Sequence, residues 1–265
     1  MDVRCMVPVG PGSRVPLDGR LACGRFLRRV NRFVAEVQLG GQIELVHVPN
    51  SGRLTQLLIP GNPVILGDRR SPTRKTDWDL ILAALPNGTS PRWSLVDSRR
   101  PMDILFRALR EGRLPEFGSL TRVDREVSVG GSRFDYRLGR DGDPGACWVE
   151  LKSVTLTVPT PWGPEARFPD APTRRGTRHL RELSALAGGG TRCAVVFAVC
   201  RPDAQSVSAH AEVDPAFASA LWDAAMAGVE IYGLRIHSDP RTGCGLEGRL
   251  PVRIVRIPSP GGNHF

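Results

Sequence analysis

A short apolar stretch contains the first residues that could do chemistry. Residues 146–156 read "ACWVELKSVTL", and their composition favours a buried strand in spite of Glu150 and Lys152. Because side chains alternate along a strand, Trp148, Glu150 and Lys152 share one face while the other face stays apolar. An acid and a base so placed could bind a metal ion and orient a water molecule. An E-x-K pattern is also common on solvated strand faces, so a catalytic reading needs a partner residue.

The preceding segment offers that partner. Residues 132–138 ("SRFDYRL") predict another strand, and "GRDGDPGA" between the two predicts a turn. In an antiparallel hairpin, the register that keeps the apolar faces together places Asp135 opposite Glu150 and Arg133 opposite Lys152. The same register directs three apolar side chains inward: Phe134, Tyr136 and Leu138. Adjacent carboxylates favour a bound cation, and Mg²⁺ is typically held by one or two of them, although Arg133 and Lys152 could simply neutralise the acids.

Lysine usage also draws attention to Lys152. Of the 36 basic residues, only Lys75 and Lys152 are lysines, so the chain uses arginine wherever a generic positive charge suffices. A lysine packed in a strand can orient a water molecule or help to deprotonate it, which the permanently charged guanidinium does poorly. We therefore interpret Lys152 as a residue selected for its chemistry.

Two neighbouring segments could extend the site. Glu126 precedes "VSVGG" and could supply a third carboxylate, or it could be solvated. In "FPDAPTRRGTRHLREL" (168–183), a helix would place three side chains on one face: Arg175, His179 and Glu182. Such a face suits phosphate contact or support of the site, and it is equally typical of an exposed charged stripe.

Composition limits the classes of function. The 265 residues are 41% hydrophobic and carry a formal net charge of +9, which favours a polyanionic partner such as nucleic acid. An arginine-rich proteome would give the same balance in an ordinary enzyme. The six cysteines show no zinc-binding spacing. With no secretory segment and no long apolar span, we expect a cytoplasmic protein without membrane contact.

The chain divides into four regions. We expect a flexible arm over residues 1–23, a small barrel of short strands over 24–98, and a strand with a tail over 241–265. Residues 99–240 alternate helix and strand signals, which predicts a mixed α/β domain. Its helices are expected to begin near Pro101, in the 173–190 segment, and at Asp214, the last as an N-cap followed by proline.

The quoted motifs resemble one known family. "VELKSVTL" followed by "FPDAPTRRGTRHLREL", with "SRFDYRL" upstream and "NSGR…PG" near the start, resembles the sugar fermentation stimulation protein A family over roughly residues 24–237. The resemblance implies an N-terminal OB-like β-barrel followed by a restriction-endonuclease-like mixed-sheet domain with flanking helices. That second domain is of the PD-(D/E)xK type, and the family is assigned as a DNA/RNA nuclease.

By position, the resemblance also implies site residues. Asp135 takes the place of the first acid, and Glu150 and Lys152 take the E-x-K. Glu126 matches a family acid, and the implied metal ligands are Asp135, Glu150 and the Leu151 carbonyl, with Glu126 as a further candidate. Further positions fall in the second motif or near it: Asp170, Arg175, His179 and Glu182. The segment with His47, Asn50 and Arg53 reads Asn-Ser-Gly where the family usually has Asn-Thr-Gly, and Asp97-Ser98 replaces the Asn-Thr of the domain junction.

The leading prediction is a Mg²⁺- or Mn²⁺-dependent nuclease of DNA or RNA, without a small-molecule cofactor. The residues expected to contact nucleic acid are Arg32, His47, Asn50, Arg53, Arg74, Lys75, Arg133, Arg174 and Arg178. The alternative is a non-catalytic DNA-binding regulator with a nuclease-like fold. Clustered acids argue against a pure binder, because without metal they repel phosphate. A sugar-linked regulator is a weaker third reading, and the oligomeric state stays open.

Overall fold

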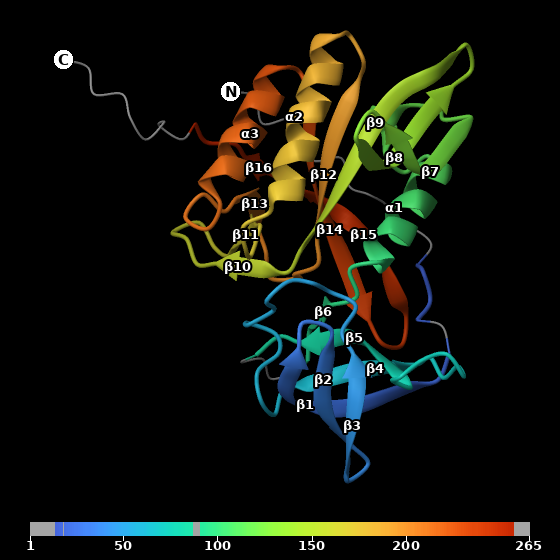
Figure 1. The fold of residues 1–265 in the computed structure, drawn as a ribbon, viewed down its shortest axis with the longest axis vertical. Helices are drawn as coiled ribbons and strands as arrows, with labels where there is room; N and C mark the ends of the chain where they lie inside the picture. Colours follow the sequence, from blue (N-terminus) through green and yellow to red (C-terminus); the bar gives the residue numbers. More distant parts are fainter. Residues whose placement is uncertain (1–13, 18, 87–90, 257–265) are drawn as a thin grey trace, which may run out of the picture.

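The structure is a computed structural model that describes residues 14–17, 19–86 and 91–256. These residues form an N-terminal barrel and a larger mixed-sheet domain (Figure 1). Residues 1–13 of the expected arm and 257–265 of the expected tail lie outside the described residues. No helix in the described ranges is long and apolar enough to cross a membrane.

The barrel is a single sheet closed on itself. Its strands are β1 (Leu21–Asn31), β2 (Val34–Leu39), β3 (Gln42–His47), β4 (Pro63–Asp68), β5 (Trp78–Ala84) and β6 (Trp93–Leu95). They follow the order β3-β2-β1-β4-β5-β6, and a parallel pairing of β3 with β5 closes the barrel. The short apolar runs predicted the later strands. Strand β1 begins inside the expected arm, and its three arginines, at positions 25, 28 and 29, obscure the alternation that would have revealed it.

The larger domain is built on a second sheet, of order β15-β14-β12-β9-β8-β7. Its strands are β7 (Arg122–Val129), β8 (Ser132–Arg140), β9 (Asp143–Val154), β12 (Cys193–Val199), β14 (Glu230–Asp239) and β15 (Gly243–Leu250). Strands β9, β12 and β14 are parallel, and the edges are antiparallel. A smaller sheet beside it contains β10 (Leu156–Val158), β11 (Glu165–Phe168), β13 (Ser206–Ala209) and β16 (Val252–Arg253).

Helices cover both faces of the central sheet. Figure 1 shows α2 (Arg174–Gly188) and α3 (Pro215–Met226) together on one side and α1 (Arg100–Arg110) on the other. Strand β12 is therefore buried along its whole length, as its unbroken apolar sequence predicts. The predicted cap of α3 is confirmed, since Asp214 Oδ1 accepts the Phe217 N–H at 2.9 Å. A short 3₁₀ turn, η1 (Pro115–Phe117), follows α1.

The β8–β9 hairpin has the predicted register over its central residues. Tyr136 pairs with Val149, Arg137 with Trp148, and Leu138 with Cys147. The turn lies at Asp141–Gly142, one residue earlier than a symmetric hairpin would place it, and an irregularity after Leu138 restores the register. The expected alternation holds as far as Tyr136, where the ladder ends.

One predicted side-chain direction in this hairpin is wrong. Phe134 does not join Tyr136 and Leu138 but packs in the opposite core, 5.8 Å from the Trp148 ring between centroids. The pairing of β8 with β9 ends at Tyr136, and the β7–β8 ladder continues to Phe134 but skips Asp135, so the regular alternation is broken at that level. Across the strand, Glu126 has a positive φ of 52°, which marks an irregular backbone at the same level.

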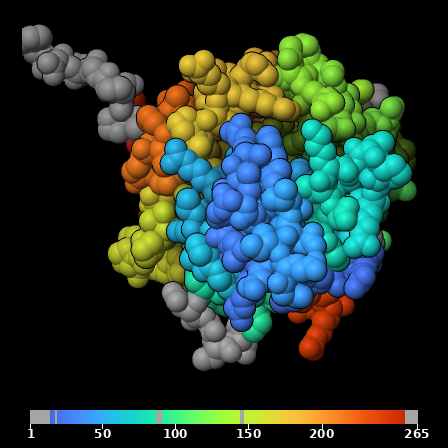
Figure 2. Space-filling view, turned by 60° about the horizontal axis from the view of Figure 1, so that its bottom comes forward, coloured from blue at the N-terminus to red at the C-terminus, as the bar shows by residue number. Residues whose placement is uncertain are grey.

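The two domains share one hydrophobic core. Ile81 and Leu95 of the barrel belong to the same cluster as Leu105 of α1 and Val196 of β12. Polar contacts cross the boundary as well, for example Gln56 Nε2 donating to the Thr157 carbonyl at 2.7 Å. Figure 2 brings the barrel forward and shows it bordered by segments of the larger domain. The barrel is thus fixed against the domain with the E-x-K strand.

Two segments near the limits of the described residues are more ordered than the sequence indicates. In the described part of the expected arm, Val15 forms a bridge with Cys244. The single C-terminal strand expected near residue 250 is replaced by the long β15 and the two-residue β16. Glycines at 243, 245 and 248 lower the strand signal of β15, which pairs with β14 and so completes the sheet edge.

Candidate active site

Asp135, Glu150 and Lys152 line one cleft between the domains. Its volume is about 450 Å³, and its walls come from the end of β8, from β9, and from the 167–173 segment. The barrel contributes the loop at residues 50–52 and the side chain of Arg32. The sequence therefore predicted three residues that the fold brings together at a surface accessible to a ligand.

Asp135 uses its carboxylate to hold the opposite strand. The Leu151 N–H donates to Asp135 Oδ2 at 2.6 Å, at the point where the β8–β9 ladder has ended. The pKa of Asp135 is raised to about 6. Burial is the main cause, and the nearby Glu150 carboxylate contributes as well. Asp135 therefore lies close to a second acid without enough positive charge to balance both.

Glu150 is buried and only partly satisfied. Its Oε1 atom contacts both Lys152 Nζ and His179 Nδ1, the latter at 2.6 Å. Burial alone would raise the pKa of Glu150, but these two contacts outweigh it and hold the pKa below its ordinary value. The other oxygen, Oε2, is buried and accepts no hydrogen bond from any residue in the described part of the chain. A buried carboxylate oxygen without a partner is costly, so this atom is positioned for a cation or a ligand.

His179 links the helix α2 to the strand β9. Its ring is 1% exposed and packs edge-on against Phe134, with 5.5 Å between ring centroids. On its far side, Arg175 Nε lies 3.4 Å from His179 Nε2, and Arg175 itself lines the cleft. The predicted helix face therefore places His179 inside and Arg175 at the cleft, so it is not an exposed charged stripe.

The donor set fits a hard divalent cation. Two adjacent carboxylates, one with an unpaired oxygen, are the ligands that Mg²⁺ and Ca²⁺ prefer. Among the described residues, no group of three or more His, Cys, Asp or Glu side chains is arranged to bind a metal. Asp135 and Glu150 would therefore hold a cation with the help of the Leu151 carbonyl and water.

Three of the predicted neighbours lie elsewhere. Glu126 is an exposed residue paired with Arg133 at 3.3 Å, so it is not a third acid beside Asp135 and Glu150. Arg133 pairs along the β7–β8 ladder and does not face Lys152. Glu182 forms an ion pair with Arg178 at 3.9 Å, one helical turn away. The irregular backbone at Glu126 turns its side chain away from the cleft edge that the sequence assigned to it.

Asp170 joins the two domains at the cleft. Its Oδ2 atom accepts the Arg53 N–H at 2.6 Å, and Gly52 lies so close that an added Cβ would be 2.6 Å from the same oxygen. Arg29 holds the other side of this loop, donating to the Gly52 carbonyl at 2.6 Å and the Asn50 carbonyl at 3.0 Å. Glycine in the Asn-Ser-Gly segment is therefore required by the close approach of Asp170.

Apart from Arg133 on the β7–β8 ladder, the residues expected to contact nucleic acid fall into three groups. Arg32 and Asn50 line the cleft, with Asn50 Nδ2 anchored to the Val96 carbonyl at 2.8 Å. His47 and Arg74 lie instead around Asp79, a buried carboxylate of β5. The remaining predicted contacts are exposed: Arg53, Lys75, Arg174 and Arg178.

Several contributors had no signal in the sequence. Ser98 lines the cleft and donates its hydroxyl to the Pro49 carbonyl at 2.8 Å. Arg29 and Arg99 are two arginines among many, and only their contacts distinguish them. Arg99 Nη2 donates to Asp79 Oδ2 at 2.6 Å and to Asp97 Oδ2 at 2.8 Å. For Ser98, the one hint in the sequence was its position after Asp97 at the domain junction.

Comparison with known proteins identifies the two domains. Residues 27–89 match the model of the SfsA N-terminal OB domain, and residues 99–242 match that of the sugar fermentation stimulation protein RE domain. A sugar fermentation stimulation protein homolog from Moorella thermoacetica is 44% identical over 229 residues, covering 86% of this chain and 95% of that protein. A homolog from Symbiobacterium thermophilum is 43% identical over 242 residues, covering 87% and 94%.

A solved structure agrees with this match. It is described as "The structure of Pyrococcus Furiosus SfsA in complex with Ca2+" and superposes with a TM-score of 0.81 at 31% identity. The match covers 92% of this chain and all of the other. The expected order, an OB barrel followed by a mixed-sheet domain, is confirmed. The chain belongs to the SfsA family of sugar fermentation stimulation proteins.

Proposed function

We propose that this protein is a divalent-cation-dependent nuclease that hydrolyses phosphodiester bonds of DNA or RNA. The observation that carries the proposal is the pair of Asp135 and Glu150 in the interdomain cleft, with an unpaired buried oxygen on Glu150 and Lys152 beside it. The nuclease-like fold supports it, and so does the Ca²⁺ complex described for the Pyrococcus furiosus relative. We expect hydrolysis when Mg²⁺ or Mn²⁺ is bound at this site.

The residues of the cleft have separate roles in the proposed reaction. The bound cation would supply charge stabilisation at the scissile phosphate. Lys152 Nζ, held by Glu150, orients the attacking water and stabilises its developing hydroxide. Arg32 and Arg175 line the same cleft from opposite domains and bind the phosphates on either side. His179 keeps Glu150 ionised and fixed in place, since it contacts the same Oε1 atom that accepts a hydrogen bond from Lys152 Nζ.

The test is cleavage of labelled single- and double-stranded DNA and RNA with Mg²⁺, Mn²⁺ or EDTA. We expect products only with the metal, and none from Lys152→Ala. Ser128→Ala on the exposed edge of β7 is the control that should leave cleavage unchanged. Tight binding without products under every metal condition would overturn the enzyme and leave a nucleic-acid-binding protein.

A further inference from the structure

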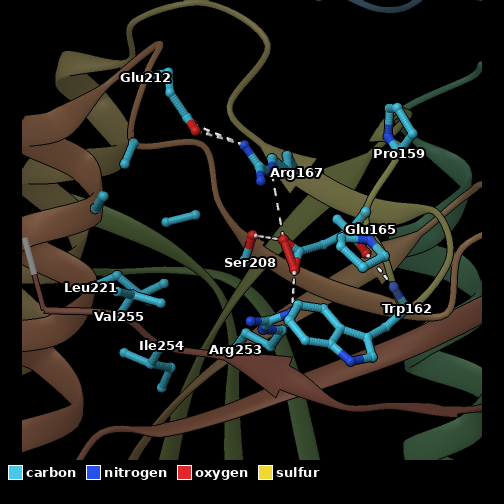
Figure 3. Close-up of a pocket in the computed structure, with 15 residues that line it drawn as sticks. Pro159, Trp162, Glu165, Arg167, Ser208, Glu212, Leu221, Arg253, Ile254 and Val255 are labelled. Carbon is cyan, nitrogen blue, oxygen red and sulfur yellow. Dashed lines mark hydrogen bonds and ion pairs between the residues drawn. The ribbon is translucent and has the colours of Figure 1, made fainter.

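A second cleft lies beside the candidate active site, on the smaller sheet. Its volume is about 410 Å³, within the usual range for ligand pockets. Figure 3 shows Trp162 and Arg253 next to Glu165, with Leu221 and Val255 across the opening. Arg167 lines both this cleft and the one that contains Glu150, so the two are neighbours across β11.

The floor of this cleft is an incompletely satisfied acid. Glu165 is 4% exposed, and its Oε2 atom accepts the Ser208 hydroxyl at 2.8 Å. Its Oε1 atom accepts no hydrogen bond from the described residues, and Arg253 Nη1 forms an ion pair with it at 3.7 Å, beyond hydrogen-bond distance. Arg167 forms an ion pair with the other oxygen, its Nε lying 3.4 Å from Glu165 Oε2, while its Nη1 donates to both oxygens of Glu212 at 2.9 Å. A buried carboxylate oxygen is left to accept an N–H from a ligand.

The wall of the cleft is an aromatic platform. Trp162 is 71% exposed, although large aromatic side chains are usually well buried. A tight turn holds it in place: the Thr160 hydroxyl donates to the Gly163 carbonyl at 2.6 Å, and Gly163 has a φ of 103°. The guanidinium of Arg253 lies 4.8 Å above the ring. Proteins bind unpaired bases by stacking them on exposed aromatic rings and on arginine guanidinium groups.

We propose that this cleft binds an unpaired nucleobase, which stacks on Trp162 and donates an N–H to Glu165 Oε1. The guanidinium of Arg253 is partly exposed, so it can move away from the Trp162 ring when a base stacks there. It can then pair with a phosphate of the same strand. A carboxylate accepts hydrogen bonds only. It therefore favours bases with an amino group over thymine or uracil, whose single N–H lies between two carbonyl oxygens. The inference rests on the proposed nucleic-acid function and makes the bound strand single-stranded next to the cleaved bond.

The test measures the affinity for fluorescently labelled dC and dT strands of about twelve nucleotides by fluorescence anisotropy, in EDTA at about pH 8. The wild type should bind the dC strand several-fold more tightly than the dT strand. Trp162→Ala should weaken dC binding by roughly 5- to 50-fold, and Trp162→Phe should keep most of it. Glu165→Gln should remove the dC preference. Met226→Ala, which truncates another exposed apolar side chain, is the control.

The outcomes separate this inference from the nuclease proposal. Equal binding of both strands by the wild type, or binding by Trp162→Ala and Glu165→Gln within about twofold of the wild type, overturns the base pocket. Base-dependent binding without metal-dependent cleavage supports the pocket and overturns only the nuclease. Competition by free CMP shows whether the base is taken from a strand alone or also from a mononucleotide.

Discussion

Two buried carboxylate sites of this protein differ in how completely they are satisfied. In the barrel, Asp79 is 1% exposed and is surrounded by three arginines, Arg99 at 2.6 Å, Arg69 at 4.0 Å and Arg74, with the His47 ring at 3.1 Å. Burial would raise its pKa, but the hydrogen bonds from Arg99, Arg74 and His47 outweigh burial and lower it. In the larger domain, Asp135 has a raised pKa and Glu150 has an oxygen without a donor.

The difference indicates different roles. A carboxylate saturated with arginines is a structural centre, because its charge is already balanced. An acidic pair with one lysine, which contacts Glu150, has less positive charge around it than Asp79 has, so it is retained where a ligand or metal completes it. The arginines of this basic chain could have neutralised Asp135 as they do Asp79. Their absence from its carboxylate is the strongest sign of a functional site.

Replacing Asp135 should have the largest effect. Asp135→Asn keeps an oxygen that can accept the Leu151 N–H, so the fold is retained while a cation ligand is lost. We expect cleavage to fall by about 10³-fold or more, as is typical when transition-state charge stabilisation is removed. Initial rates at saturating Mg²⁺ measure this. Asp124→Asn, a carboxylate on the neighbouring β7, should cleave at the wild-type rate, and equal losses in both variants would contradict the assignment.

Replacing Asp79 should produce the opposite pattern. Asp79→Asn leaves several cations facing a neutral amide, and we expect unfolding to become easier by about 2–4 kcal/mol. That is somewhat below the range of about 3–5 kcal/mol for a broken buried pair, because Arg99 is half-exposed. Urea denaturation measures the loss. Cleavage per folded molecule should stay within a few-fold of the wild type, and an inactive but stable Asp79→Asn would break the comparison.

The pH dependence of stability should show the strain at Asp135. Its folded pKa of about 6 exceeds the ordinary value of 3.8, so between these pH values the folded state keeps a proton that the unfolded chain releases. Wild-type stability therefore falls as the pH rises through this window. In EDTA at pH 8, Asp135→Asn should be up to about 2–3 kcal/mol more stable than the wild type. The gain should vanish below about pH 4, and a pH-independent difference would contradict the raised pKa.

Cation binding should relieve that strain. At about thirty times its Kd, Ca²⁺ should stabilise the wild type by about 2 kcal/mol, and thermal unfolding with and without EDTA measures the shift. Asp135→Asn and Glu150→Gln should show little change. Asp79→Asn should respond like the wild type, because its cations leave no place for another. A similar shift in all the variants would mean that Ca²⁺ binds elsewhere.

The smallest expected effect is on binding of the strand. Arg175→Ala should lower affinity for nucleic acid by a few-fold and reduce the slope of log K against log salt by about one, since one phosphate contact is lost. Arg181→Ala removes an exposed arginine on a different face of the same helix and should change neither. Equal effects of the two would mean that α2 contributes only general charge.

Much of the site followed from local sequence rules. Alternation in β9 placed Glu150 and Lys152 together, and apolar matching fixed the β8–β9 register that brings Asp135 to the same end. The rules failed where the chain leaves a regular ladder. Phe134 lies on the unexpected side and Glu126 turns outward, because neither position is held by continuous strand pairing.

The sequence by itself determined the two-domain order, the three helices, most strands of the larger sheet, and the three residues Asp135, Glu150 and Lys152 that come together at one cleft. These depend on periodicity and on contacts between consecutive strands, which are local. Only the tertiary structure decided which charges are balanced. The cations around Asp79, the docking of Asp170 on the barrel loop, and the unpaired oxygens of Glu150 and Glu165 depend on segments distant in the chain. No spacing encodes such contacts, because they arise when separate segments pack together, within each domain and, at Asp170, between the two.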